Sequence, residues 1–189
     1  MESDREPDDY LDQLTSIHAD LAGIPLDRAL FHAAWEGDVA ETGLLLAAKA
    51  DARTIYEDNN TALHLTAFNG HTACAQLLLE ARAKVKNKNV HGNNPLHLAV
   101  QNGHTACAQV LLEARAYPRT QNKDGHDALH LAVMNGYTAC AHLLLHAQDT
   151  GNKADIDAKT KQGWTALQLS AYENHSAQSY CWTTRARQR

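Results

Sequence analysis

The apolar positions along this chain follow a helical spacing that returns at a fixed interval. Residues 69–83 contain a polar Asn-Gly-His bend and then a run of alanines and leucines, and residues 102–116 repeat this pattern 33 positions later. A third copy begins at Asn135, and a short motif of two leucines around a histidine precedes each copy. Self-similarity at a fixed period of this length is typical of proteins built from stacked repeats.

Each unit is predicted to contain two short helices joined by a tight bend. The first helix follows a residue whose side-chain oxygen can accept a free N–H at the helix start. These capping residues are Thr61, Asn94, Asp127 and Thr165. The bend needs a left-handed backbone, which glycine adopts readily. The bend glycines are Gly70, Gly103 and Gly136.

The second helix of each unit has an apolar stripe that the unit cannot bury alone. In one unit the stripe consists of Cys74 and the leucine run 77–79. Neighbouring units must therefore stack to remove this surface from water.

The Ala-Leu-His or Pro-Leu-His motif, the Asn-Gly-His bend and the Leu-Leu-Leu-Glu-Ala run together resemble the ankyrin repeat over about residues 28–175. The resemblance implies an all-α ankyrin-repeat solenoid of about five helix-turn-helix units with β-hairpin or turn fingers. It also implies a concave face, made by the first helices and the fingers, that binds proteins. No catalytic role is implied.

This interpretation divides the chain into three parts. Residues 1–27 are an acidic segment with a capping helix, in which Tyr10, Leu14, Ile17 and Leu21 follow helical spacing. The repeats are predicted at about 28–55, 56–88, 89–121, 122–159 and 160–182, with five inserted residues near 148–152. Residues 176–189 form a C-terminal cap and an arginine-rich tail.

The residue before the bend is the leading candidate for a protein contact. This column contains Trp35, Phe68, Gln101, Met134 and Tyr172. Its position in the repeat places it on the concave surface, and aromatic residues and methionine are enriched at binding interfaces. For Trp35 and Tyr172, which lie in end units, packing against the capping segments is the alternative.

The finger tips supply a second group of candidate contacts. They are Asp58, Asn60, His91, Asn93, Asp124, His126 and Trp164. Such a polar mixture suits specific recognition around an apolar centre, although turn residues are also commonly just solvated.

One column departs from the ankyrin pattern. Where glycine usually follows the second helix, this chain has Lys49, Arg82, Arg115 and Lys153. A left-handed backbone costs a residue other than glycine roughly 1 kcal/mol. The column either binds an acidic partner or reflects duplication of one ancestral unit.

The repeat explains most of the histidines and cysteines without catalysis. His64, His97 and His130 follow the caps, and His71 and His104 lie in the bend, so we expect structural hydrogen bonds. Cys74, Cys107 and Cys140 should lie roughly 10 Å apart in the core. His142 and His146 are four residues apart but have no third ligand. We therefore expect that the protein binds no metal, no cofactor and no small-molecule substrate, and that it is not an enzyme.

Composition narrows the location and the partner further. The net charge is −5, so nucleic acid is an improbable partner. No stretch has the length of a membrane span, and the first residues are acidic where a signal peptide would be basic and then apolar. We therefore expect a cytoplasmic or nuclear protein without a membrane partner.

Three functional hypotheses follow. The first is an adaptor, scaffold or inhibitor that binds a partner protein through the concave surface. The second is a pathogen effector that tethers host proteins in a eukaryotic cytosol. The third is a nucleic-acid-associated regulator that uses Arg185, Arg187 and Arg189 of the tail.

Overall fold

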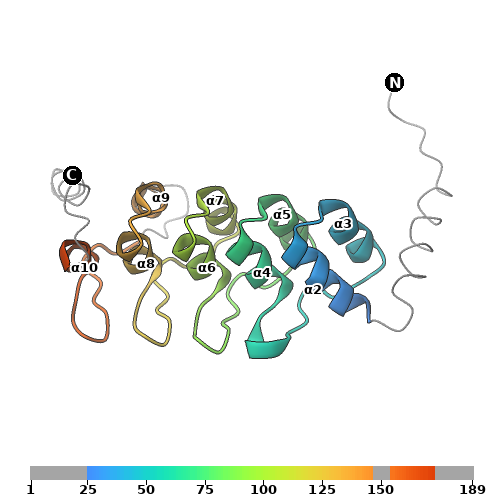
Figure 1. Ribbon diagram of the computed structural model, residues 1–189, viewed down its shortest axis with the longest axis horizontal. Coiled ribbons are helices and arrows are strands. Elements are labelled where there is room, and N and C mark those ends of the chain that lie inside the picture. Colours follow the sequence, from blue (N-terminus) through green and yellow to red (C-terminus); the bar gives the residue numbers. More distant parts are fainter. Residues whose placement is uncertain (1–24, 147–153, 173–189) are drawn as a thin grey trace, which may run out of the picture.

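The protein is a row of helix pairs arranged in two layers (Figure 1). The computed structural model describes residues 25–146 and 154–172. The first helices form one layer: α2 (Leu26–Glu36), α4 (Ala62–Asn69), α6 (Pro95–Gln101), α8 (Ala128–Met134) and α10 (Ala166–Tyr172). The second helices form the other: α3 (Val39–Ala47), α5 (Thr72–Glu80), α7 (Thr105–Glu113) and α9 (Thr138–His146). The all-α repeat architecture predicted from the sequence is confirmed.

Several predicted features lie outside the described residues. They are the N-terminal capping helix, the insertion near 148–152, the second helix of the fifth unit and the arginine-rich tail. None of the helices within the described ranges has both the length and the apolar character needed to cross a membrane.

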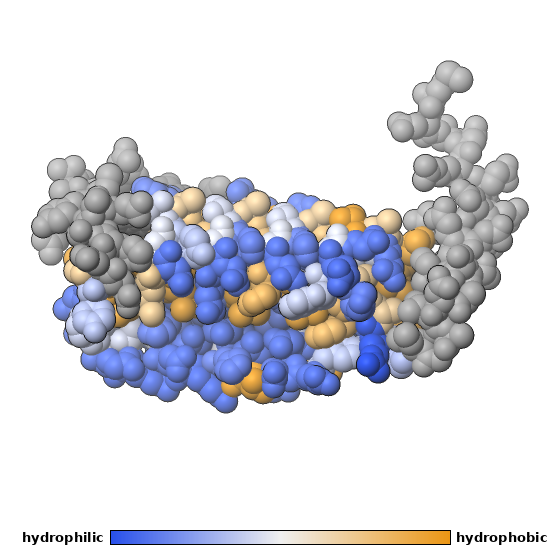
Figure 2. Space-filling view, viewed as in Figure 1, coloured by the Kyte–Doolittle hydropathy of each residue, from blue (hydrophilic) through white to orange (hydrophobic). Residues whose placement is uncertain are grey.

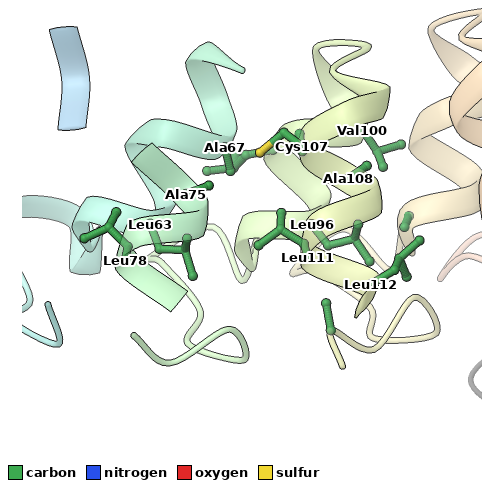
Figure 3. Packing of buried hydrophobic residues seen from close by; sticks show 14 of the residues in the cluster. Leu63, Ala67, Ala75, Leu78, Leu96, Val100, Cys107, Ala108, Leu111 and Leu112 are labelled. Carbon is green, nitrogen blue, oxygen red and sulfur yellow. The ribbon is translucent and has the colours of Figure 1, made fainter. Parts of the chain in front are cut away.

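The core is a continuous layer of leucine and alanine between the two rows of helices. Leu78 of α5, Leu111 of α7 and Leu144 of α9 are fully buried. Leu63 and Leu96, from the first helices, belong to the same cluster, and Figure 3 shows residues of α4, α5, α6 and α7 that contribute to it. Because helices of several units contribute to this one cluster, no pair of helices could bury its apolar stripe alone.

The helix caps predicted from the sequence are present. Asn94 Oδ1 accepts the backbone N–H of His97 at 3.0 Å, and Asp127 Oδ1 accepts that of His130 at the same distance. In the second unit the Thr61 hydroxyl lies 2.9 Å from Nδ1 of His64, which also accepts the backbone N–H of Thr61 at 3.1 Å. These bonds satisfy donors that would otherwise be left unpaired at a buried helix start.

The cap histidines also connect each first helix to the finger that follows it along the stack. The ring nitrogen Nε2 of His64 lies 3.2 Å from the carbonyl oxygen of Asn93. Nε2 of His97 lies 2.8 Å from the carbonyl oxygen of Thr120. His130 reaches the Trp164 carbonyl in the same way, at 3.3 Å. Since a carbonyl can only accept, Nε2 carries the proton in each ring. The expected structural role of these histidines is confirmed.

Burial lowers the pKa of His64 and of His97 to about 4, because the charged imidazolium would lose its hydration. His130 behaves differently. Burial also acts to lower its pKa, but the hydrogen bond and negative charge of Asp127, 2.7 Å away, outweigh burial and raise it. The fourth unit thus has a buried pair of imidazole and carboxylate with a raised histidine pKa, where the second and third units have rings with a lowered pKa.

The bend histidines connect the units in the opposite direction. His71 Nε2 lies 3.0 Å from the Trp35 carbonyl, and His104 Nε2 lies 3.0 Å from the Phe68 carbonyl. The His104 ring packs directly over Gly70, where an added Cβ would lie 2.5 Å from the ring nitrogen Nδ1. Gly70 is therefore required both for its positive φ of 77° and for this close approach.

The fingers are tight turns rather than extended hairpins. Asn89, Asn122 and Thr160 each donate a backbone N–H to the carbonyl of the residue four positions later, at 2.9 Å. Within the described residues, one β-bridge joins Lys159 to Thr165 and no strand is formed. The first finger contains a 3-10 turn, η1 (Glu57–Asn59), instead of a glycine.

We predict that Leu78→Ala or Leu111→Ala lowers the free energy of unfolding by about 2 to 5 kcal/mol, because each change leaves a cavity between units. Urea denaturation followed by circular dichroism measures the loss. Leu167→Ala is the matched control, since Leu167 is 39% exposed. An equal effect of the buried and exposed changes would contradict the core assignment.

We also predict that stability falls as the pH is lowered from 7 to 5. A histidine with a folded pKa near 4 and an unfolded pKa near 6.5 binds its proton first in the unfolded chain, so acid favours unfolding. Each ring should account for about 1 to 2 kcal/mol by pH 5. The pKa of His130 is raised, so its contribution to the free energy of unfolding is instead lost as the pH rises above 6.5.

The variant His64→Gln with His97→Gln tests this effect. Glutamine is compatible with the position, because Gln168 Oε1 accepts the backbone N–H of Thr165 at 2.9 Å in the fifth unit. Thermal melts of the variant between pH 7 and pH 5 should show a smaller fall in Tm than the wild type. Parallel pH curves for the two proteins would rule out these histidines as the cause.

Candidate functional site

The first helices and the fingers enclose a groove of about 600 Å³. It extends from Trp35 in the first unit to Met134 in the fourth. The side of the molecule on which the fingers lie is mainly hydrophilic, whereas hydrophobic side chains gather over the helical layers (Figure 2). The groove thus lies between a polar edge and an apolar helical surface.

Two aromatic side chains form one end of the groove. The rings of Trp35 and Phe68 are stacked, with centroids 6.1 Å apart and planes 15° apart. The two side chains remain 46% and 43% exposed. Their backbone is held in place, because the Trp35 carbonyl accepts from Asn69 Nδ2 and His71, and the Phe68 carbonyl accepts from His104. Phe68 therefore packs against its neighbour in the column while both rings present surface to the groove.

The rest of the predicted column is divided between the groove and the C-terminal end of the stack. Gln101 and the half-buried Met134 line the groove. Tyr172 does not line it. Its side chain is 73% exposed and contacts Trp164 edge-on, with ring centroids 5.6 Å apart. The structure thus brings together four of the five column residues.

The predicted finger residues are divided in the same way. Those that line the groove are Asn60, His91, Asn93, Asp124 and His126. Asp58 and Trp164 do not. Burial lowers the pKa of His126, and the nearby His130 lowers it further. His126 is therefore expected to be neutral near pH 7, with Asp124 the negative group on this wall.

Two of these amides also hold the fingers together. Asn60 Oδ1 accepts a hydrogen bond from Asn89 Nδ2 at 3.1 Å, and Asn93 Oδ1 accepts one from Asn122 Nδ2 at 3.0 Å. Sequence reasoning missed Asn89 and Asn122, which line the groove as well. Their 33-residue separation was the signal that could have found them.

Three leucines that the sequence analysis did not select line the groove between the candidate contacts. Leu65, Leu98 and Leu131 are each less than 10% exposed. They lie in one repeat column on α4, α6 and α8, so the same spacing could have identified them. They give the groove an apolar surface beneath its polar walls.

The cysteines are placed in the core, as predicted. Cys74, Cys107 and Cys140 are buried and free. Burial raises the pKa of all three thiols, to about 12 for Cys107, so that they remain protonated near neutral pH. Thr42 and Thr105 hydroxyls pair with Cys74 and Cys140 at 3.7 and 3.3 Å. These thiols are packing groups.

The described residues contain no group of three or more histidine, cysteine or acidic side chains placed to hold a metal ion. The rings of His142 and His146 stack on each other, with centroids 5.9 Å apart. This pair packs ring on ring along the exposed side of α9.

The comparisons with known proteins agree with this geometry. The family model for ankyrin repeats, with three copies, matches residues 30–122 and 114–178. No curated protein matches the chain. Ankyrin repeats are generally protein-protein interaction modules. The matched segments and the stacked helix pairs lead to one conclusion, that this chain belongs to the ankyrin repeat family.

Proposed function

We propose that the protein binds a partner protein through the groove and acts as an adaptor, scaffold or inhibitor. The observation that carries the proposal is the stacked pair of Trp35 and Phe68 at one end of the groove, with nearly half of each side chain exposed. Burying aromatic surface of this kind on binding gives a large favourable free energy.

The dimensions of the groove suit a segment of polypeptide. Successive helices in such a stack lie roughly 10 Å apart, so the four units from Trp35 to Met134 extend over roughly 30 Å. A helix of about 20 residues has this length. Along this path a partner would meet the apolar surface of Leu65, Leu98 and Leu131 and the polar wall of the fingers.

The groove is also organised before binding. Hydrogen bonds from the next unit hold the backbone of Trp35 and Phe68, and amide pairs connect the fingers. A surface that is already ordered loses little conformational entropy when a partner binds. These contacts support a rigid docking surface.

We predict that Phe68→Ala with Met134→Ala weakens capture of the partner at least tenfold while changing the Tm by only a few degrees. Both side chains line the groove and neither is fully buried, so truncation removes binding surface more than core. Affinity purification from cell lysate with quantitative mass spectrometry measures the captured protein.

The matched control is Val39→Ala with Ile55→Ala. These two side chains are 45% and 56% exposed and do not line the groove. The control should capture the same proteins as the wild type. Equal capture by the groove variant would reject the groove as the binding site.

A further inference from the structure

Two columns of basic residues follow the junction between each second helix and the next finger. Lys49, Arg82 and Arg115 form the first column, and Arg53, Lys86 and Arg119 form the second, each at 33-residue spacing. All six side chains are exposed, and none lines the groove. We call these six residues the basic ridge.

Contacts between units join the two columns into one surface. Arg53 donates from Nε to the Arg82 carbonyl at 3.2 Å, which links the first and second units. Lys86 Nζ lies 3.9 Å from the centre of the Tyr117 ring, which links the second and third. The hydrogen bond and charge of Lys86, and in addition the charge of Arg115, lower the pKa of the Tyr117 phenol. Lys86 and Arg115 therefore act on the same ring.

The ridge is a positive region on a negative chain. Residues 80–119 include six basic and two acidic residues, although the whole chain has a net charge of −5. Of the two acids, Glu113 accepts a hydrogen bond from Gln109 at 3.1 Å. Among the described residues, no carboxylate lies within ion-pair distance of Arg82, Lys86 or Arg115. The positive charge of these three residues is therefore not neutralised by a carboxylate of the described residues.

The residues of the first column have a backbone conformation that is unfavourable for any residue except glycine. Lys49, Arg82 and Arg115 have φ values of 71°, 64° and 64°, in the region that favours glycine. Lysine and arginine also replace one another within both columns, whereas an unaltered duplication would repeat one residue. Charge is thus the shared property, and strained positions that retain a particular chemistry are typical of functional sites.

We propose that the basic ridge binds an acidic polypeptide segment of a partner protein. Guanidinium groups pair with carboxylates through two parallel hydrogen bonds, and the repeat spacing presents such groups at regular intervals along the stack. The ridge is a second contact surface, separate from the groove, so that one partner or two can be held at once.

Two observations favour a polypeptide over a nucleic acid. Proteins that bind single strands use several exposed aromatic rings on which successive bases stack, whereas the ridge contacts one ring, that of Tyr117, and Lys86 already lies over one of its faces. A long polyanion would also be repelled by the rest of the chain, since the whole chain has a net charge of −5. Charges that are farther apart than the Debye length, about 10 Å at 0.1 M salt, are largely screened. A short acidic segment bound at the ridge therefore interacts mainly with the basic residues of the ridge.

The test uses the full-length protein and a fluorescently labelled octaglutamate peptide, with binding followed by anisotropy at about 20 mM salt. The variant is Arg82→Gly with Arg115→Gly. It removes two charges and at the same time relieves the backbone, so the Tm should rise by roughly 2–6 °C. The control is Lys123→Gln with Lys159→Gln, which removes the same charge away from the ridge.

The expected result is binding that the ridge variant weakens about fivefold or more, while the control stays within about twofold of the wild type. No binding by the wild type, or equal loss in both variants, would overturn the proposal. Tighter binding of an eight-nucleotide single strand with the same dependence on Arg82 and Arg115 would overturn it in favour of nucleic acid.

Discussion

Stacking between neighbouring repeats is the interaction on which the rest of this structure depends. The helices are only seven to eleven residues long, and helices of that length are marginal in water without tertiary packing. Leu78, Leu111 and Leu144 are buried in one cluster to which helices of all the described units contribute. Secondary structure, core and binding surface therefore form together or not at all, as expected of a linear array whose stability comes from contacts between nearest neighbours.

The polar contacts between units show how a stack of short helices becomes a defined surface. His97 reaches forward to the next finger, and His104 reaches back to the preceding first helix. The carbonyls that accept from His64 and His104 belong to Asn93 and Phe68, which line the groove, so these contacts also set the position of its walls. Phe68 is the clearest example, since its carbonyl is held by the next repeat while its ring faces the groove.

The 33-residue period made the fold and most of the candidate site predictable. Residues that occupy the same position in successive repeats form a row along the stack. Phe68, Gln101 and Met134 were therefore expected on one surface, and they lie along one groove. The departures occur where the side chains leave the common pattern. Tyr172 contacts Trp164 instead of the groove, and this contact between two non-repeated residues has no signal in the period. Asp127 replaces a neutral cap with a carboxylate, and its effect on His130 depends on a distance of 2.7 Å that only coordinates reveal.

Docking of a partner in the groove, with the outer helices left free, can be tested by site-specific photocrosslinking. A photoreactive amino acid replaces Gln101, which lines the groove, or Gln76, which is exposed on the second helix α5. We expect a captured partner to crosslink strongly from position 101 and little from position 76. Crosslinks that form equally from both positions, or mainly from position 76, would contradict it.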